Sequence, residues 1–216
     1  MQTVMPKRGV VRQPGARWRI AIIDDHARSR ALVVKTVASL GGSVVAEADT
    51  AAAGIELVEG LRPDAVVLAV GLPDRDGVDV AAEIMRRAPC PIVLLTSRAG
   101  PDVARRARSS GAMAYLLKPL RPEELEPAIE LAIARFADLD EASREAASLR
   151  QALAERKRIE RAKGLLMTRL GVTEAEAFRV LQKTAMDRRV SLVTLADAVI
   201  KAQDETTLPR SHPGAS

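Results

Sequence analysis

The chain of 216 residues has few cysteine, histidine and aromatic residues, and each shortage excludes a class of protein. A single cysteine, Cys90, excludes an internal disulfide and a zinc site made of cysteines. The two histidines, His26 and His212, give little basis for a histidine metal site. Aromatic residues make up 2% of the chain, which argues against a protein that stacks single-stranded bases on aromatic side chains. Any nucleic-acid recognition then depends on arginine, lysine and backbone groups, with a duplex or a structured loop as the target.

Long apolar runs are absent as well. No run reaches the roughly 18–20 residues that a membrane-spanning helix needs, and the basic start lacks the apolar core of a signal peptide. Neither a nucleophile paired with a base nor a cluster of metal ligands is visible, so we expect no enzyme and no cofactor. These shortages indicate a cytoplasmic protein without a membrane partner.

Short apolar runs alternate with segments of helical period in the first half of the chain. This alternation is typical of a parallel sheet covered by helices on both faces. We therefore expect a doubly wound α/β domain with a five-stranded parallel sheet over residues 18–121. The preceding residues 1–17, basic and rich in proline and glycine, and the polar residues 203–216 are expected to be a disordered arm and tail. The expected strands lie within residues 19–23, 44–45, 65–68, 92–95 and 114–117.

Polar side chains follow three of these strands. Asp24 and Asp25 follow the first strand, Thr96 and Ser97 end the fourth, and Lys118 follows the fifth. The carboxyl ends of the strands form the functional edge of such a sheet. The arrangement resembles the receiver domain of two-component response regulators, a flavodoxin-like fold. In that family the paired acids bind a divalent cation and an Asp at the end of the third strand accepts a phosphoryl group, whose oxygens the hydroxyl and the lysine hold.

The third strand departs from the receiver pattern. Its phosphoacceptor position is occupied by Ala69, whose methyl group cannot accept a phosphoryl group. Among the nearby carboxylates, only Asp74 in the following loop could reach the pocket. Loss of this acid also removes a metal ligand, so we expect Asp24 and Asp25 to pair with Lys118 and to bind magnesium only weakly. The domain is therefore interpreted as a pseudo-receiver, controlled by a regulatory protein or a ligand.

A long helix is expected after the sheet. Residues 122–152 are interpreted as the last receiver helix, continuing as a coiled-coil linker. Apolar residues recur there at steps of four and three, with one extra three-residue step between positions 139 and 142. Such a seam needs a second helix to cover it, which favours a parallel homodimer; alternatively, the helix packs back against its own receiver. The seam comprises Leu125, Ile129, Ala132, Phe136, Leu139, Ala142, Ala146, Leu149 and Leu153.

Three short amphipathic helices are expected over residues 153–202. Gly171 is expected to end the first helix, as glycine does at many helix C-termini. Thr173 and Glu176 have the spacing of a capping box at the start of the second helix, and Ser191 begins the third. The expected buried stripe of the second helix comprises Ala177, Val180, Leu181 and Thr184.

Basic residues outnumber acids in this segment. Between Arg150 and Lys201 there are twelve Lys or Arg residues against six Asp or Glu residues. The bias extends over all three helices, which makes nucleic-acid binding as plausible as a merely solvated charged surface. On a helical wheel, Lys157 and Arg161 point away from the apolar face. The candidate contacts are Arg156, Lys157, Arg161, Lys163, Lys183, Arg188 and Arg189.

A longer pattern runs through the same segment. It comprises Arg156, Ile159, Ala162-Lys163-Gly164, Leu166-Met167, Glu176-Ala177-Phe178, Leu181, Ala185-Met186, Leu195-Ala196 and Ile200. The pattern resembles an ANTAR domain, the RNA-binding output module of bacterial transcription antiterminators. The resemblance implies that each module binds a stem with a small terminal loop in nascent RNA, so that a dimer holds paired stem-loops and prevents a terminator hairpin. Two alternatives remain: a DNA-binding response regulator, and a protein-interaction adaptor that binds no nucleic acid.

Overall fold

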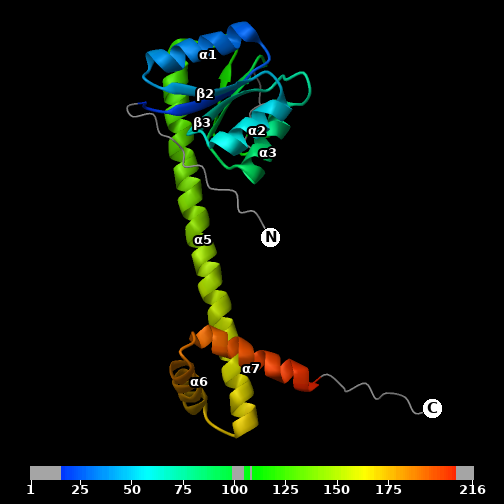
Figure 1. Ribbon diagram of the computed structural model, residues 1–216, viewed down its shortest axis with the longest axis vertical. Helices are drawn as coiled ribbons and strands as arrows, with labels where there is room; N and C mark the ends of the chain where they lie inside the picture. The colour runs from blue at the N-terminus through cyan, green and yellow to red at the C-terminus, as the bar shows by residue number, and fades with distance from the viewer. Residues whose placement is uncertain (1–15, 99–104, 108, 208–216) are drawn as a thin grey trace, which may run out of the picture. The chain divides into compact units, whose positions relative to one another are not determined.

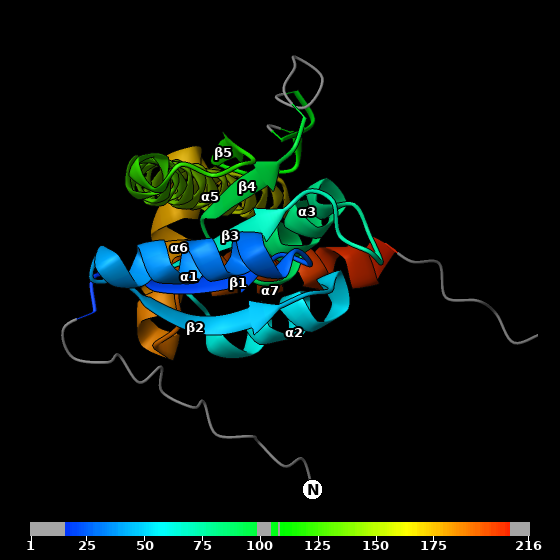
Figure 2. The same ribbon diagram turned by 90° about the horizontal axis from the view of Figure 1, so that it is seen from above.

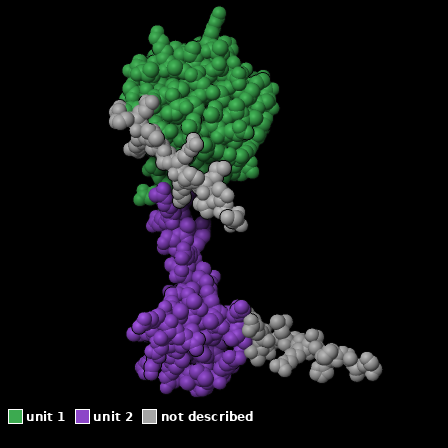
Figure 3. Space-filling view, viewed as in Figure 1, with its two compact units in different colours: residues 1–141 green, residues 142–216 purple. Residues whose placement is uncertain are grey.

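The chain forms two compact units, residues 1–141 and 142–216 (Figure 3). The structure is a computed structural model that describes residues 16–98, 105–107 and 109–207. The first unit holds two buried apolar clusters, one on each face of a sheet, and the second holds a smaller cluster of its own. Each unit therefore has the core that an independent functional part requires.

A five-stranded parallel sheet forms the centre of the first unit (Figure 1), with strand order β2-β1-β3-β4-β5. Strands β1, β3 and β4 are buried along their whole length, as expected for central strands covered on both faces. The doubly wound α/β fold expected from the sequence is confirmed. The strands are β1 (Arg19–Ile23), β2 (Ser43–Ala48), β3 (Ala65–Ala69), β4 (Ile92–Thr96) and β5 (Ala114–Leu117).

Helices cover both faces of this sheet (Figure 2). Alternate residues of β1 show the division, because neighbouring side chains on a strand point to opposite faces. Ile20 and Ile22 pack in the cluster with α1 and the start of α5, whereas Ala21 and Ile23 pack in the cluster with α2 and α3. The helices are α1 (Ala27–Ser39), α2 (Ala51–Leu61), α3 (Gly77–Arg87) and α5 (Pro122–Leu170).

The start of α5 belongs to the core of the first unit. Leu125, Ile129 and Ala132 are fully buried against the sheet. The prediction that these three residues form part of a coiled-coil seam is therefore wrong: they repeat at the same spacing, but the protein's own sheet covers them. Phe136, the next seam residue, packs partly buried against the same cluster, and the large apolar side chains of the seam beyond it are more than half exposed. We call these the seam leucines: Leu139, Leu149 and Leu153, with exposed fractions of 56%, 65% and 55%.

The second unit contains the end of α5, α6 (Glu174–Arg188) and α7 (Leu192–Thr207). Gly171, with φ of +66°, follows the end of α5, as expected. The predicted capping box of α6 is confirmed, since the Thr173 amide donates to the Glu176 carboxylate at 2.8 Å and the Thr173 hydroxyl accepts from the Glu176 amide at 3.4 Å. The apolar cluster of this unit comprises Ala162, Leu181, Ala185, Leu195 and Ala196, and Ala177 of the expected α6 stripe is fully buried as well.

Three sequence-based expectations differ from the structure. Arg17, assigned to a disordered arm, donates its amide to the Gly41 carbonyl at 2.8 Å and forms ion pairs with α5. Helix α7 continues to Thr207, so the predicted tail begins too early. Val180, expected in the buried stripe of α6, is 41% exposed, because the helix turns Ala185 toward the core instead. The rest of the expected arm and tail, residues 1–15 and 208–216, lies outside the described residues.

Helix α5 is 49 residues long, but charged residues recur along it. Among the described helices, none combines the length and the apolar character needed to cross a membrane.

Candidate functional site

The carboxyl edge of the sheet brings three of the predicted pocket residues together. Asp24, at the end of β1, is fully buried, and the Lys118 ammonium lies 2.8 Å from its carboxylate. Thr96 is buried at the end of β4, and its carbonyl accepts the Lys118 amide at 2.8 Å. Asp25 is exposed beside the pair, so the expected pairing with Lys118 is made by Asp24.

Two opposed effects act on the pKa of Asp24. Burial tends to raise it, but hydrogen bonds from Lys118, Ser29 and the His26 amide, together with the charge of Lys118, leave the pKa below its usual value. Asp24 is therefore ionised at neutral pH and held by a counter-charge within the protein. This ion pair occupies the place where a receiver uses the same two groups for cation and phosphoryl binding.

Ala69 lies at the end of β3, the strand adjacent to β1 on this edge. Its side chain is completely buried. A Cβ atom on Gly77 would lie 2.0 Å from the Ala69 carbonyl oxygen, so only glycine lets α3 begin this close to the strand. The residue that the sequence predicts at the phosphoacceptor position thus has a packed methyl group as its side chain.

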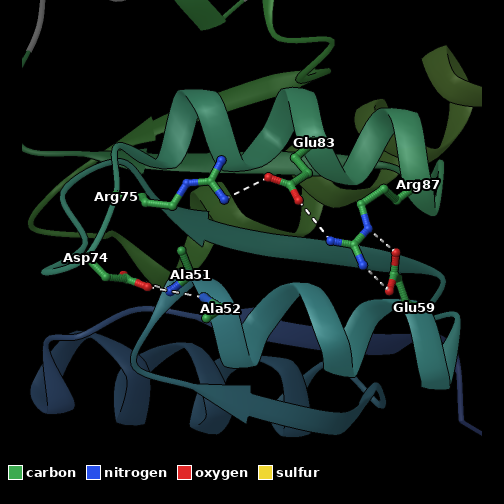
Figure 4. Close-up of polar contacts among 7 residues, drawn as sticks. All are labelled: Ala51, Ala52, Glu59, Asp74, Arg75, Glu83 and Arg87. Atoms are coloured by element: carbon green, nitrogen blue, oxygen red, sulfur yellow. Dashed lines mark hydrogen bonds and ion pairs between the residues drawn. The ribbon is translucent and has the colours of Figure 1, made fainter.

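The loop after Ala69 holds its acids away from the pocket. Asp74 accepts hydrogen bonds from the amides of Ala51 at 2.9 Å and Ala52 at 3.2 Å, at the start of α2 (Figure 4). The Ala51 bond is the main reason that the pKa of Asp74 is lowered. The possibility that Asp74 replaces the missing acid is therefore wrong, because its carboxylate satisfies orphan amides at a helix N-terminus.

A chain of ion pairs continues from this loop along α2 and α3 (Figure 4). Arg75 lies 2.7 Å from Glu83, which lies 2.9 Å from Arg87, and Arg87 also pairs with Glu59 on α2. Exposed pairs of this kind each stabilise a protein little. Their effect here is geometric, since they join the loop and both helices into one polar network.

The residues at this edge do not fit a magnesium site. Magnesium prefers several oxygen ligands, and the carboxylate of Asp24 already faces Lys118. Of the predicted pair of acids, only Asp25 is then left to bind a cation, and one carboxylate does not supply several oxygen ligands. Elsewhere in the described ranges, no group of three or more His, Cys, Asp or Glu side chains could hold a metal ion.

A groove of about 420 Å³ lies beside the ion pair. Residues at the start of α1, among them Arg28 and Leu32, form one wall, and Ser97 with the segment from Lys118 to Leu120 forms the other. The groove therefore combines basic and hydroxyl groups with apolar surface, a combination that suits a ligand or a partner segment.

Removing the cation of the buried pair should destabilise the first unit. Lys118→Met removes the ion-pair partner of the buried Asp24 carboxylate, and the expected loss is about 3–5 kcal/mol in the free energy of unfolding near pH 7.5. In the variant, burial raises the pKa of Asp24, so the deficit should shrink as the pH falls below that raised pKa. Urea unfolding near pH 7.5 and near pH 5 measures both effects. Lys35→Met removes an exposed lysine from α1 and serves as the control; equal stability of the two variants would contradict the prediction.

The second candidate site is the basic face of α5, defined by Lys157 and Arg161. Both side chains are exposed, whereas Ile159 and Leu166 on the other side of the helix pack against the core of the unit. A Cβ on Gly164, in the next turn, would meet no atom within 4 Å. The face therefore presents two cations beside open backbone, which allows a phosphate backbone to approach closely.

Lys163, also a predicted contact, has a different environment. Its side chain is only 10% exposed, and its ammonium lies 2.9 Å from Glu160 and 2.6 Å from Glu174. These two carboxylates, Glu174 first, raise the pKa of Lys163. The ammonium also lies 5.7 Å from the centre of the Phe178 ring. Lys163 thus links α5 to the start of α6 through its ion pair with Glu174. This role does not agree with the selection of Lys163 as an RNA contact.

The outer face of α6 adds further cations. Lys183 and Arg188, both predicted contacts, are exposed, and so is Arg179, which is not among the predicted contacts. Met186 has an exposed fraction of 76%, the largest among the exposed large apolar side chains described. Met186 belongs to the pattern that resembles an ANTAR domain, but it is not among the predicted contacts. Arg156 and Arg189 are exposed as well.

Comparison with known proteins supports a receiver domain in the first unit and an ANTAR domain in the second. A response regulator receiver domain matches residues 20–130, and an ANTAR domain matches residues 147–200. The transcriptional regulatory protein PdtaR of Mycobacterium tuberculosis is 42% identical over 183 residues, which cover 85% of this chain and 89% of PdtaR. The chain belongs to the ANTAR-domain response regulators. Regulation of transcription is therefore the broad function of this response regulator.

Solved structures similar to this response regulator cover its receiver domain. A LuxR-family response regulator from Aurantimonas has a TM-score of 0.52 and 32% identity, over 54% of this chain and 85% of that chain. The receiver domain of a modulated diguanylate cyclase from Desulfovibrio desulfuricans has a TM-score of 0.52 and 27% identity, over 56% of this chain and 96% of that chain. The resemblance of the sheet to a receiver domain is thereby confirmed.

Proposed function

We propose that this response regulator is a transcription antiterminator that binds stem-loops in nascent RNA and thereby prevents a terminator hairpin from forming. The observation that carries the proposal is the basic face of α5 within an ANTAR domain. Groups that contact phosphates have to be exposed and clustered on one surface, and Lys157 and Arg161 meet both conditions. The cations on the outer face of α6 extend the positive surface of the same unit.

The proposal includes a homodimer formed through α5. The seam leucines are exposed at coiled-coil spacing, and a second copy of the helix would cover them. A parallel pair would present two ANTAR domains to two stem-loops in one RNA. Binding would then be bivalent, and its affinity would exceed that of a single domain by about 10²–10⁴-fold where the geometry permits.

Control without phosphorylation is the third part of the proposal. The side chain of Ala69 offers no oxygen to a phosphoryl donor, and the carboxylate of Asp74 is hydrogen-bonded to amides at the start of α2. The signal therefore has to be a binding event, and the groove beside the Asp24–Lys118 pair is a suitable place for a regulatory protein or a ligand.

The two alternative functions, a DNA-binding response regulator and a protein-interaction adaptor, predict different features of the ANTAR unit. A DNA-binding regulator of the helix-turn-helix kind places its recognition helix second, whereas the first helix of this unit carries the densest positive charge. An adaptor that binds only proteins would not need two exposed cations beside open backbone. RNA binding is consistent with both features.

A salt-titrated binding assay tests the proposal. The purified protein is titrated with a two-stem-loop RNA, an unstructured RNA of the same length, and duplex DNA. We expect preference for the stem-loops, with affinity that falls steeply as salt increases. Preference for duplex DNA would favour the DNA-binding regulator, and equal or absent binding to all three would favour the adaptor.

Exposure to a small phosphodonor tests the independence from phosphorylation. After incubation with acetyl phosphate and magnesium, intact-mass measurement should detect no phosphorylated wild-type protein, because position 69 has no carboxylate. A phosphorylated aspartate elsewhere in the chain would contradict the prediction. A receiver domain that retains its acceptor, treated in parallel, shows that the phosphodonor is active.

A further inference from the structure

Met186 is the most exposed of the large apolar side chains described on α6, and it lies among cations. Met186 is 76% exposed, and Arg179 and Lys183 lie seven and three residues before it, on the same side of the helix. The buried residues Leu181 and Ala185 face the opposite way, toward the core of the unit. From Arg179 to Arg189 the helix and its C-cap carry four Lys or Arg residues and one acid, Asp187.

This composition suits a nucleic acid better than a protein. An exposed methionine forgoes the stabilisation that burial of its side chain would provide. The neighbouring exposed apolar residues are two valines, Val180 and Val190, at 41% and 40% exposure. Such an apolar area is small compared with the roughly 800 Å² that each partner buries in a standard protein interface. The face of a single unpaired base is a small flat surface, and the backbone of its nucleotide carries a phosphate that the surrounding cations attract.

Aromatic side chains, the usual groups that stack on a base, are scarce in the unit. Phe178 is the only aromatic residue from position 142 onward. It is partly buried, and the Lys163 ammonium lies above its ring. The thioether of methionine is polarisable and makes favourable contacts with aromatic rings, and its three rotatable bonds let it adapt to the ring. Met186 is therefore the exposed side chain of α6 best suited to the face of a base.

We propose that Met186 contacts an unpaired base in the terminal loop of the RNA, while Arg179 and Lys183 hold the adjoining phosphates. Met186 would then distinguish a stem that ends in a loop from a continuous duplex, because paired bases are stacked and do not present their faces. This inference rests on the proposed function. In this inference the basic face of α5 binds the RNA backbone, and the outer face of α6 contacts the terminal loop.

The test compares Met186→Ala with the wild-type full-length protein on two RNAs, the two-stem-loop RNA and a fully paired duplex of equal length. We expect Met186→Ala to weaken binding of the stem-loops about five- to tenfold and to leave duplex binding within about twofold. Met186→Leu should retain most of the affinity, since it keeps an apolar side chain. Leu170→Ala removes another exposed apolar side chain of the unit, at 55% exposure, and should change neither affinity.

A fluorescent base analogue such as 2-aminopurine, placed in turn at each loop position, locates the contact. With wild-type protein, one loop position should change its fluorescence strongly on binding, and Met186→Ala should abolish that change. Unchanged stem-loop affinity in Met186→Ala, or an equal loss on stem-loop and duplex, would overturn the inference and leave the proposed function intact. A wild-type protein that does not prefer stem-loops would instead contradict the proposed function itself.

Discussion

Lys157→Gln combined with Arg161→Gln should weaken binding of the two-stem-loop RNA by about 30- to 100-fold at moderate salt. Both side chains are exposed on the face of α5 that points away from the core, so their replacement should remove phosphate interactions and leave the three helices packed. The slope of log affinity against log salt concentration should fall by about two, since each phosphate that is no longer neutralised lowers it by about one. Fluorescence anisotropy at several salt concentrations measures both quantities.

The matched control removes the same charge from the other unit. Lys35→Gln combined with Arg86→Gln lowers the net charge by two, at exposed positions on α1 and α3. We expect this variant to bind RNA within about twofold of the wild type, since the long-range effect of net charge is screened in salt. A similar loss of affinity in both double variants would show that total charge matters and the basic face does not.

We expect Leu149→Gln combined with Leu153→Gln to abolish the proposed dimer and leave a monomer. These seam leucines are exposed along α5, and the substitutions replace apolar surface with polar groups of similar size that suit a helix. Analytical ultracentrifugation at micromolar concentration should show the change in mass. Circular dichroism should remain that of the wild type, because neither residue lies in a described apolar core.

The same variant should lose the advantage of two-point binding. Its affinity for a two-stem-loop RNA should fall by about 10²–10⁴-fold, and its affinity for a single stem-loop should remain within about twofold. Ala147→Gln combined with Ser148→Gln, at exposed positions outside the seam, serves as the control and should leave both values unchanged. A protein that remains dimeric after both leucines are replaced would show that α5 is not the dimer interface.

Local signals in the sequence predict much of the fold, because the residues responsible act over short distances. The Thr173–Glu176 capping box and the Gly171 helix end both involve groups within one turn of helix. The buried strands are equally visible, since a central parallel strand needs apolar residues on both faces. The proposed loss of the phosphoacceptor at Ala69 is inferred from the order of the strands and from one residue identity.

Contacts between distant segments account for what the sequence does not reveal. The sequence makes Lys163 a candidate RNA contact, but the fold brings Glu174 to within 2.6 Å of its ammonium. Asp74 is close enough in sequence to reach the pocket, but its carboxylate binds amides at the start of α2. In both cases the side chain has an opposite charge or an orphan amide within reach, and spacing does not reveal which partner the fold supplies.

The sequence by itself determined the order of secondary structure, the presence of alanine at position 69 and the excess of positive charge in the last third of the chain. Only the tertiary structure decided which cations are exposed, which half of the α5 stripe is core and which is surface, and that Met186 projects outward. The physical reason is that periodicity shows that one face of a helix is apolar, whereas burial depends on what packs against that face. Leu125 and Leu149 repeat at the same spacing, and only the sheet beneath Leu125 makes them different.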